Sequence, residues 1–117
     1  MKKNLNVEDI FTIAYQNHQK NNFEKAEDLY KKVLEINPNH YESIFLLGTL
    51  FAQIKKFDLA VELLNKAVQI QPDNAHAYNN LGGVLKELED KEKAIICFEK
   101  VIKIDPNFVE AYNNLGL

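Results

Sequence analysis

The sequence has few cysteines and no long apolar run, and each of these properties excludes a class of protein. One cysteine among 117 residues cannot form an internal disulfide, so nothing indicates an oxidising compartment. No apolar run reaches the roughly 20 residues that a helix needs to cross a bilayer. The opening segment MKKNLNVEDIF lacks the apolar region of a signal peptide. We therefore expect no membrane partner and a cytoplasmic location if the sequence is complete; in a longer protein, targeting signals could lie elsewhere.

The chain also lacks an excess of charge of one sign. The 14 basic and 17 acidic residues give a net charge of −3 and are mixed along the sequence, which argues against a nucleic-acid partner. A hydrophobic fraction of 46% with 26% charged residues is ordinary for a soluble domain and too apolar for a disordered chain. Composition therefore indicates one ordinary folded domain.

What the chain does have is an internal repeat. Pro38, Pro72 and Pro106 are 34 residues apart, and the residues between them repeat in phase. After a lead of residues 1–6, the units are 7–40, 41–74 and 75–108, followed by the truncated start of a fourth unit at 109–117. A fixed period of this length is typical of a solenoid, in which each unit contacts only its neighbours.

Each unit is predicted to contain two helices. Apolar residues recur at helical spacing in the first half of each unit, and again in the second half up to the proline. Polar pairs separate the halves at 21–22, 55–56 and 89–90. Small residues recur at one phase of the first helix, which suggests that a neighbouring backbone passes close there; they are Ala14, Gly48, Gly82 and Gly116. The fold class is therefore all-α, an α-solenoid of antiparallel helix pairs.

Residues that carry chemistry are sparse. His18, His40 and His76 have no partner at metal-ligand spacing in the sequence. Cys97 occupies the repeat column of Leu29 and Leu63, so we expect a buried packing thiol rather than a nucleophile. The glycine pair at 82–83 lacks the spacing of a phosphate-binding loop. We expect no metal site, no cofactor and no catalytic residues, and hence a protein that is not an enzyme.

These units resemble the tetratricopeptide repeat. The segment YNNLGGVL…A…F…P at 78–106 fits that pattern closely, and IFLLGTLF…A…L…P at 44–72 fits well. The first unit is looser, with Ile10 at the aromatic position and Ala14 at the glycine. The usual glycine between the two helices is absent, so the turns at Lys55 and Glu89 are expected to be strained or closed differently.

The resemblance implies a right-handed superhelix whose first helices line a concave groove. Family members are mostly scaffolds that hold peptide segments or helices of partner proteins. By phase, the residues predicted to line the groove are Glu8, Phe11, Tyr15, His18, Gln19, Glu42, Phe45, Thr49, Ala52, Gln53, His76, Asn79, Gly83, Lys86, Glu87, Glu110 and Asn113.

This set of residues bears on the kind of ligand. Family members that clamp acidic peptide tails need converging basic and amide residues, but Phe11 and Phe45 stand at such positions and Lys86 is the only predicted groove cation. With Tyr15, these rings suggest an apolar patch for aliphatic or aromatic side chains or an amphipathic helix. The alternative is that the rings pack against neighbouring helices.

Asn80 and Asn114 stand 34 residues apart and resemble the asparagine ladder in the repeat region of O-linked N-acetylglucosamine transferases. Stacked amides there hold a peptide backbone, which suits a planar group that both donates and accepts. Thr12 and Leu46 interrupt the ladder in the first two units. The alternative, which we favour, is that asparagine is simply common at this phase.

The sequence thus predicts a non-catalytic scaffold that binds a peptide or helix of a partner protein. One alternative is the N-terminal repeat region of a larger enzyme, such as a glycosyltransferase or methyltransferase, which recruits its protein substrate. Another is a self-assembling structural module, because Tyr112 and Leu115 belong to columns that normally pack against a second helix, and none follows. We therefore expect self-association of the isolated chain through its open C-terminal end.

Overall fold

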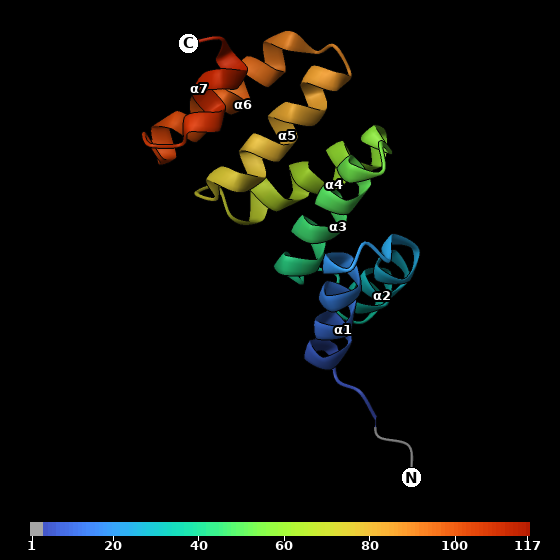
Figure 1. Cartoon of the computed structure of the whole chain (residues 1–117). Coiled ribbons are helices and arrows are strands. Elements are labelled where there is room, and N and C mark those ends of the chain that lie inside the picture. Colours follow the sequence, from blue (N-terminus) through green and yellow to red (C-terminus); the bar gives the residue numbers. More distant parts are fainter. Residues whose placement is uncertain (1–3) are drawn as a thin grey trace.

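The computed structural model describes residues 4–117 as seven α-helices stacked one after another, with no strand among these residues (Figure 1). The helices are α1 (Val7–Gln19), α2 (Phe23–Ile36), α3 (Tyr41–Gln53), α4 (Phe57–Ile70), α5 (Ala75–Glu87), α6 (Lys91–Ile104) and α7 (Val109–Leu115). The described part is elongated, measuring 58 × 24 × 21 Å. The predicted all-α solenoid is confirmed. None of the helices in residues 4–117 has the length and apolar character to traverse a bilayer.

The helices pair in chain order. α1 packs on α2, α3 on α4 and α5 on α6, while α2–α3, α4–α5 and α6–α7 join one pair to the next. In addition α3 contacts α5 directly, so the first helices of the second and third units lie side by side. Their first residues lie at 7, 41, 75 and 109, in step with the sequence period of 34 residues.

Side chains at the helix starts explain where most first helices begin. Asn6 and Asp9 form a capping box at α1: Asp9 N–H donates to Asn6 Oδ1 at 2.8 Å, and Asn6 N–H donates to Asp9 Oδ2 at 3.2 Å. His40 caps α3 by accepting from the Ser43 N–H through Nδ1 at 3.3 Å. Asn74 caps α5 in the same manner. Each cap satisfies backbone donors that the first turn of a helix leaves unpaired.

The turn within each unit closes identically, although none of the three carries glycine. Asn21, Lys55 and Glu89 each have φ of 63°, the left-handed conformation. In the second unit the Lys56 N–H donates to Phe51 O at 2.8 Å and the Lys55 N–H to Ala52 O at 3.1 Å. The other two turns repeat both bonds, which together form a Schellman motif. All three turns therefore have the standard hydrogen bonds of a helix C-terminus. The strain expected at Lys55 and Glu89 is confined to their positive φ angles.

The core lies between the two helices of each pair. The alanine column of the second helices is buried, with Ala26 and Ala60 fully enclosed. A β-carbon at Gly48 would lie 3.0 Å from Leu64 Cγ, and one at Gly82 only 2.7 Å from Phe98 Cε1. The close approach expected at these glycines is thus made by side chains of the paired helix, not by its backbone.

Candidate functional site

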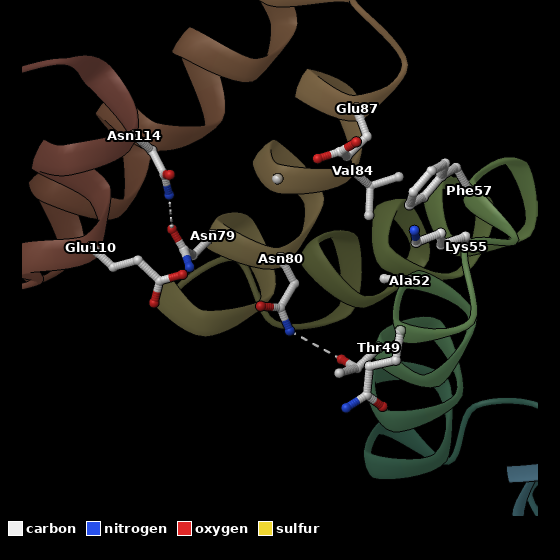
Figure 2. A pocket seen from close by; sticks show the side chains of 12 residues that line it. Thr49, Ala52, Lys55, Phe57, Asn79, Asn80, Val84, Glu87, Glu110 and Asn114 are labelled. Atoms are coloured by element: carbon white, nitrogen blue, oxygen red, sulfur yellow. Dashed lines mark hydrogen bonds between the residues drawn. The ribbon is translucent and has the colours of Figure 1, made fainter.

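A groove of about 460 Å³ runs across α3, α5 and α7 (Figure 2). Its lining residues come from the first helices of three successive units, together with the turn and helix start that follow α3. They are Thr49, Ala52, Gln53, Lys55, Phe57, Asn79, Asn80, Gly83, Val84, Glu87, Glu110 and Asn114. The apolar side chains of Ala52, Phe57 and Val84 form one part of the wall, and polar groups form the rest. Apolar surface combined with a few polar groups is typical of a ligand-binding site.

The groove is open because Gly83 has no side chain. A β-carbon at Gly83 would have no heavy atom within 4 Å, so that position faces empty space. The equivalent positions of the first two units carry Tyr15 and Thr49. Gly83 therefore makes room that a larger residue at the same phase would fill.

Asparagine amides connect neighbouring units along the groove (Figure 2). Asn80 Nδ2 donates to Thr49 Oγ1 at 3.0 Å, joining α5 to α3, and Asn114 Nδ2 donates to Asn79 Oδ1 at 3.4 Å, joining α7 to α5. Each bond fixes the orientation of an amide. Because an amide nitrogen has two hydrogens, Asn80 and Asn114 each keep one further donor.

Three charged side chains line the groove, namely Lys55, Glu87 and Glu110. Among residues 4–117 no ion pair joins any of them to another residue. Lys55 belongs to the turn after α3 and was not among the predicted groove residues. Helical periodicity, on which that prediction rests, does not say where the side chain of a turn residue points. Phe57 and Val84 also line the groove and were not among the residues predicted to do so.

Part of the predicted groove set comes together here. The structure places Thr49, Gln53, Asn79 and Glu87 in one groove, with Ala52, Gly83 and Glu110 beside them. Asn114 lines the groove, whereas its neighbour Asn113 is exposed outside it. Gln19 also lies outside and is exposed.

Most of the aromatic rings predicted to form an exposed apolar patch instead pack against other side chains of the protein. Phe11 is half-buried, with ring centroids 6.3 Å from Tyr15, 6.1 Å from Tyr30 and 5.1 Å from His40. Phe45 is also half-buried and stacks on Tyr41 at 6.2 Å. Of the three predicted rings only Tyr15 is well exposed, at 41%. These contacts favour the packing alternative for Phe11 and Phe45.

His18 is not an open groove contact, because it is only 8% exposed. Its Nδ1 lies 2.9 Å from Tyr30 Oη and its Nε2 lies 2.6 Å from Gln53 Oε1, so both ring nitrogens are engaged. Burial raises the pKa of Tyr30, so its hydroxyl keeps its proton and can donate to Nδ1. His18 therefore ties the first unit to the second from within the interface.

His40, the N-cap of α3, ties the start of that helix to α1. This residue is 7% exposed, and its Nε2 lies 3.0 Å from Glu8 Oε1. Its Nδ1 is 3.8 Å from a carboxylate oxygen of Glu42. Glu8 and Glu42 thus gather around one buried imidazole, although both carboxylates are exposed to solvent.

The remaining predicted residues lie elsewhere. His76 is exposed and meets the Phe108 ring edge-on at 5.1 Å. Lys86 lines a separate notch beside Phe98 and Leu115, on the side of α5 that faces α6 and α7. The groove cation is therefore Lys55, where the sequence pointed to Lys86.

Two features bear on reactivity. The Cys97 thiol is 8% exposed, and burial raises its pKa to about 11, so it is a protonated packing group as its column predicted. Within residues 4–117 no three His, Cys, Asp or Glu side chains are placed to hold a metal ion.

Stacked helix pairs with a groove along the first helices define a helical-repeat protein. Three family models match the chain: tetratricopeptide repeat at residues 18–67, TPR repeat at 48–89 and tetratricopeptide repeat at 75–108. Together they span residues 18–108. The chain belongs to the tetratricopeptide repeat family.

Solved structures agree with this assignment. A MamA fragment from Desulfovibrio magneticus RS-1 is 27% identical with a TM-score of 0.92, over 95% of this chain and 63% of that one. The chain thus spans less than two thirds of that protein's length. An O-GlcNAc transferase from Thermobaculum terrenum is 27% identical with a TM-score of 0.85, over 93% of this chain and 21% of that one.

A third solved structure shares the fold. The first TPR of Spaghetti (RPAP3), bound to an HSP90 peptide, is 24% identical with a TM-score of 0.89, over 93% of this chain and 86% of that one. Comparison with curated proteins gives no significant match.

Proposed function

We propose that the chain is a non-catalytic interaction module that binds a peptide segment of a partner protein in the groove across α3, α5 and α7. The observation that carries this proposal is the groove itself, with an apolar wall and fixed amides from consecutive units. The protected state of Cys97 is in keeping with a protein that works by contact rather than by reaction.

The geometry suits an extended peptide. Asn80 and Asn114 each keep one amide hydrogen that can donate to a backbone carbonyl of a ligand in the groove. Ala52, Phe57 and Val84 provide apolar surface for one of its side chains. Contacts on this scale correspond to about −8 kcal/mol, a micromolar dissociation constant.

A variant with a large side chain in the groove tests the proposal. A random peptide library displayed on phage is panned against the protein, and recovered peptides are synthesised and titrated by fluorescence anisotropy. The variant Gly83→Tyr introduces the residue that the first unit carries at this phase, and we expect it to weaken binding at least tenfold. The control Asn65→Tyr adds the same ring at an exposed position of α4 outside the groove and keeps wild-type affinity. Unchanged binding to the Gly83→Tyr variant would refute the groove as the site.

A second candidate function is supported by the likeness to the O-GlcNAc transferase. This chain would then be the repeat region of a larger enzyme, and the same groove would hold the enzyme's protein substrate. Asn80 and Asn114, which line the groove at equivalent phases, favour it. The coding sequence downstream of Leu117 discriminates the two: a catalytic domain there supports the second candidate, and further repeats followed by a stop support the first.

A further inference from the structure

A buried histidine outside the groove is bonded to one of the polar side chains that line it. His18 of α1 is only 8% exposed and lies between Tyr30 of α2 and Gln53 of α3. Gln53 itself is exposed and lines the groove. Because each nitrogen of a neutral imidazole either donates or accepts, the bonds of His18 determine which end of the Gln53 amide faces it.

Tyr30 fixes the tautomer of this imidazole. The tyrosine is fully buried, and within residues 4–117 its hydroxyl takes part in no hydrogen bond other than that to His18. The hydroxyl hydrogen therefore needs His18 Nδ1 as its acceptor, at 2.9 Å, because a buried donor without an acceptor is costly. With Nδ1 accepting, the single hydrogen of the neutral ring is on Nε2.

The hydrogen on Nε2 in turn orients Gln53. It is donated to Gln53 Oε1, with the two heavy atoms 2.6 Å apart, across the boundary between the first and second units. The oxygen and the nitrogen of a planar amide point away from each other, so the NH2 group of Gln53 is directed away from His18. No hydrogen bond among residues 4–117 uses that NH2 group, which leaves its two hydrogens for a ligand.

Gln53 lies one helical turn from Thr49, which accepts from Asn80 (Figure 2). Side chains four residues apart share one face of a helix and are about 5–6 Å from each other. Alternate carbonyls of an extended peptide point the same way and are about 6.6 Å apart. The NH2 group of Gln53 and the spare hydrogen of Asn80 are thus spaced suitably for two alternate carbonyls of one extended chain.

We propose that Gln53 binds the peptide in the groove by donating from its NH2 group to a backbone carbonyl, and that His18 and Tyr30 are positioning residues that hold the amide in this orientation. This inference rests on the proposed function. It gives the buried imidazole of the first unit an effect on a groove formed by α3, α5 and α7. Because a backbone carbonyl is present in every peptide, this contact adds affinity without a preference for particular side chains.

Two measurements on the unmodified protein test the orientation. Long-range proton–nitrogen correlation spectra at about pH 8, where histidine is ordinarily neutral, report which ring nitrogen of His18 carries the hydrogen. We expect the hydrogen on Nε2. When a peptide recovered from the phage library binds, the side-chain amide signals of Gln53 should shift. A hydrogen on Nδ1, or Gln53 signals that stay in place while the peptide binds, would overturn the proposal.

A variant of Gln53 tests the effect on affinity. Gln53→Met keeps the length of the side chain and removes its donors, and we expect about a fivefold loss in peptide affinity. The control Gln69→Met makes the same change at an exposed position of α4 outside the groove and should alter affinity less than twofold. Circular dichroism checks that both fold. Wild-type affinity in the Gln53→Met protein would contradict a role for this amide.

A double-mutant cycle separates positioning from a purely structural role of Tyr30. Tyr30→Phe keeps the ring and removes the hydrogen donated to His18 Nδ1, so either ring nitrogen can then carry the hydrogen and the Gln53 amide can turn over. We expect mixed His18 tautomers and about a two- to threefold loss in affinity, but no further loss when Tyr30→Phe is added to Gln53→Met. Losses that add in the double variant would assign Tyr30 a structural role and overturn the positioning roles.

Failures of the two proposals are distinguishable. Peptides that lose binding to Gly83→Tyr but bind normally to Gln53→Met would overturn the role of Gln53 and leave the groove as the site. If no peptide binds, or if Gly83→Tyr binds normally, both proposals fail.

Discussion

Gly82 and Gly83 are neighbours in the sequence but meet opposite surroundings. A β-carbon at Gly82 would lie 2.7 Å from the buried Phe98 ring, whereas one at Gly83 meets nothing within 4 Å. The first glycine is therefore required by packing within a helix pair. No packing contact requires the second glycine, and the space beside it belongs to the groove.

Alanine at the two positions should have opposite effects on stability. Gly82→Ala forces the Phe98 ring to shift, and we expect a loss of about 1–3 kcal/mol in the free energy of unfolding. Gly83→Ala adds no clash and gains helix propensity, for a stabilisation of up to about 1 kcal/mol. Urea denaturation followed by circular dichroism measures both. Equal effects of the two variants would contradict the packing described here.

Because of Cys97, we expect the free energy of unfolding to depend on pH in the alkaline range. Burial raises the pKa of its thiol from 9.0 to about 11, so below pH 9 the thiol is protonated in both states and contributes nothing to the difference. From pH 9 to 11 the unfolded chain ionises first, and the free energy of unfolding should fall by at most about 3 kcal/mol. Comparing the pH dependence with that of Cys97→Ala isolates this thiol from other alkaline titrations. A variant with the same slope would show that the thiol ionises equally in both states.

At the scale of the element, the turns between paired helices each place a side chain in a left-handed conformation. The cost is about 1–2 kcal/mol for an ordinary residue and less for asparagine. Repetition of the same Schellman bonds in all three units shows that this conformation is set by the helix pair rather than by the residue present.

Glycine in these turns should therefore stabilise the protein. We expect Glu89→Gly to raise the free energy of unfolding by about 1 kcal/mol, because glycine adopts φ of 63° without strain. Asn21→Gly should change it by a few tenths at most, since asparagine tolerates this conformation. Thermal unfolding by calorimetry compares them. A destabilised Glu89→Gly protein would mean that the turn is not strained.

Polar bonds between units differ from one boundary to the next. At the first boundary the buried imidazole of His18 bonds to Gln53, and His40 at the start of α3 bonds to Glu8 of α1. The second has Asn80 bonded to Thr49, and α7 is held by Asn114 on Asn79. The groove lies along the latter boundaries, whereas at the first boundary the Phe11 ring packs against Tyr15 and His40.

At the scale of the whole molecule, the repeat made the fold predictable. Periodic apolar residues and the proline spacing predict two helices per unit, and the helices begin in step with that period. The first helices could likewise be given a groove side, which brings Thr49, Asn79 and Glu87 together.

Details of the groove could not be predicted from the position of each residue within the repeat. His18 shares its helical face with groove residues, but its depth depends on partners 12 and 35 residues away. The packing of Phe11 depends on His40 from another element. Lys55 reaches the groove from a turn, where side-chain direction follows from φ and not from helical periodicity.

The central claim is that peptides bind along α3, α5 and α7. Nuclear magnetic resonance of the isotope-labelled protein tests it most directly, because asparagine side-chain amides give their own signals. On addition of a selected peptide, we predict shifts of the Asn79, Asn80 and Asn114 side-chain signals and of the Gly83 backbone amide. Shifts confined to α2, α4 and α6, with these four signals unmoved, would contradict the account.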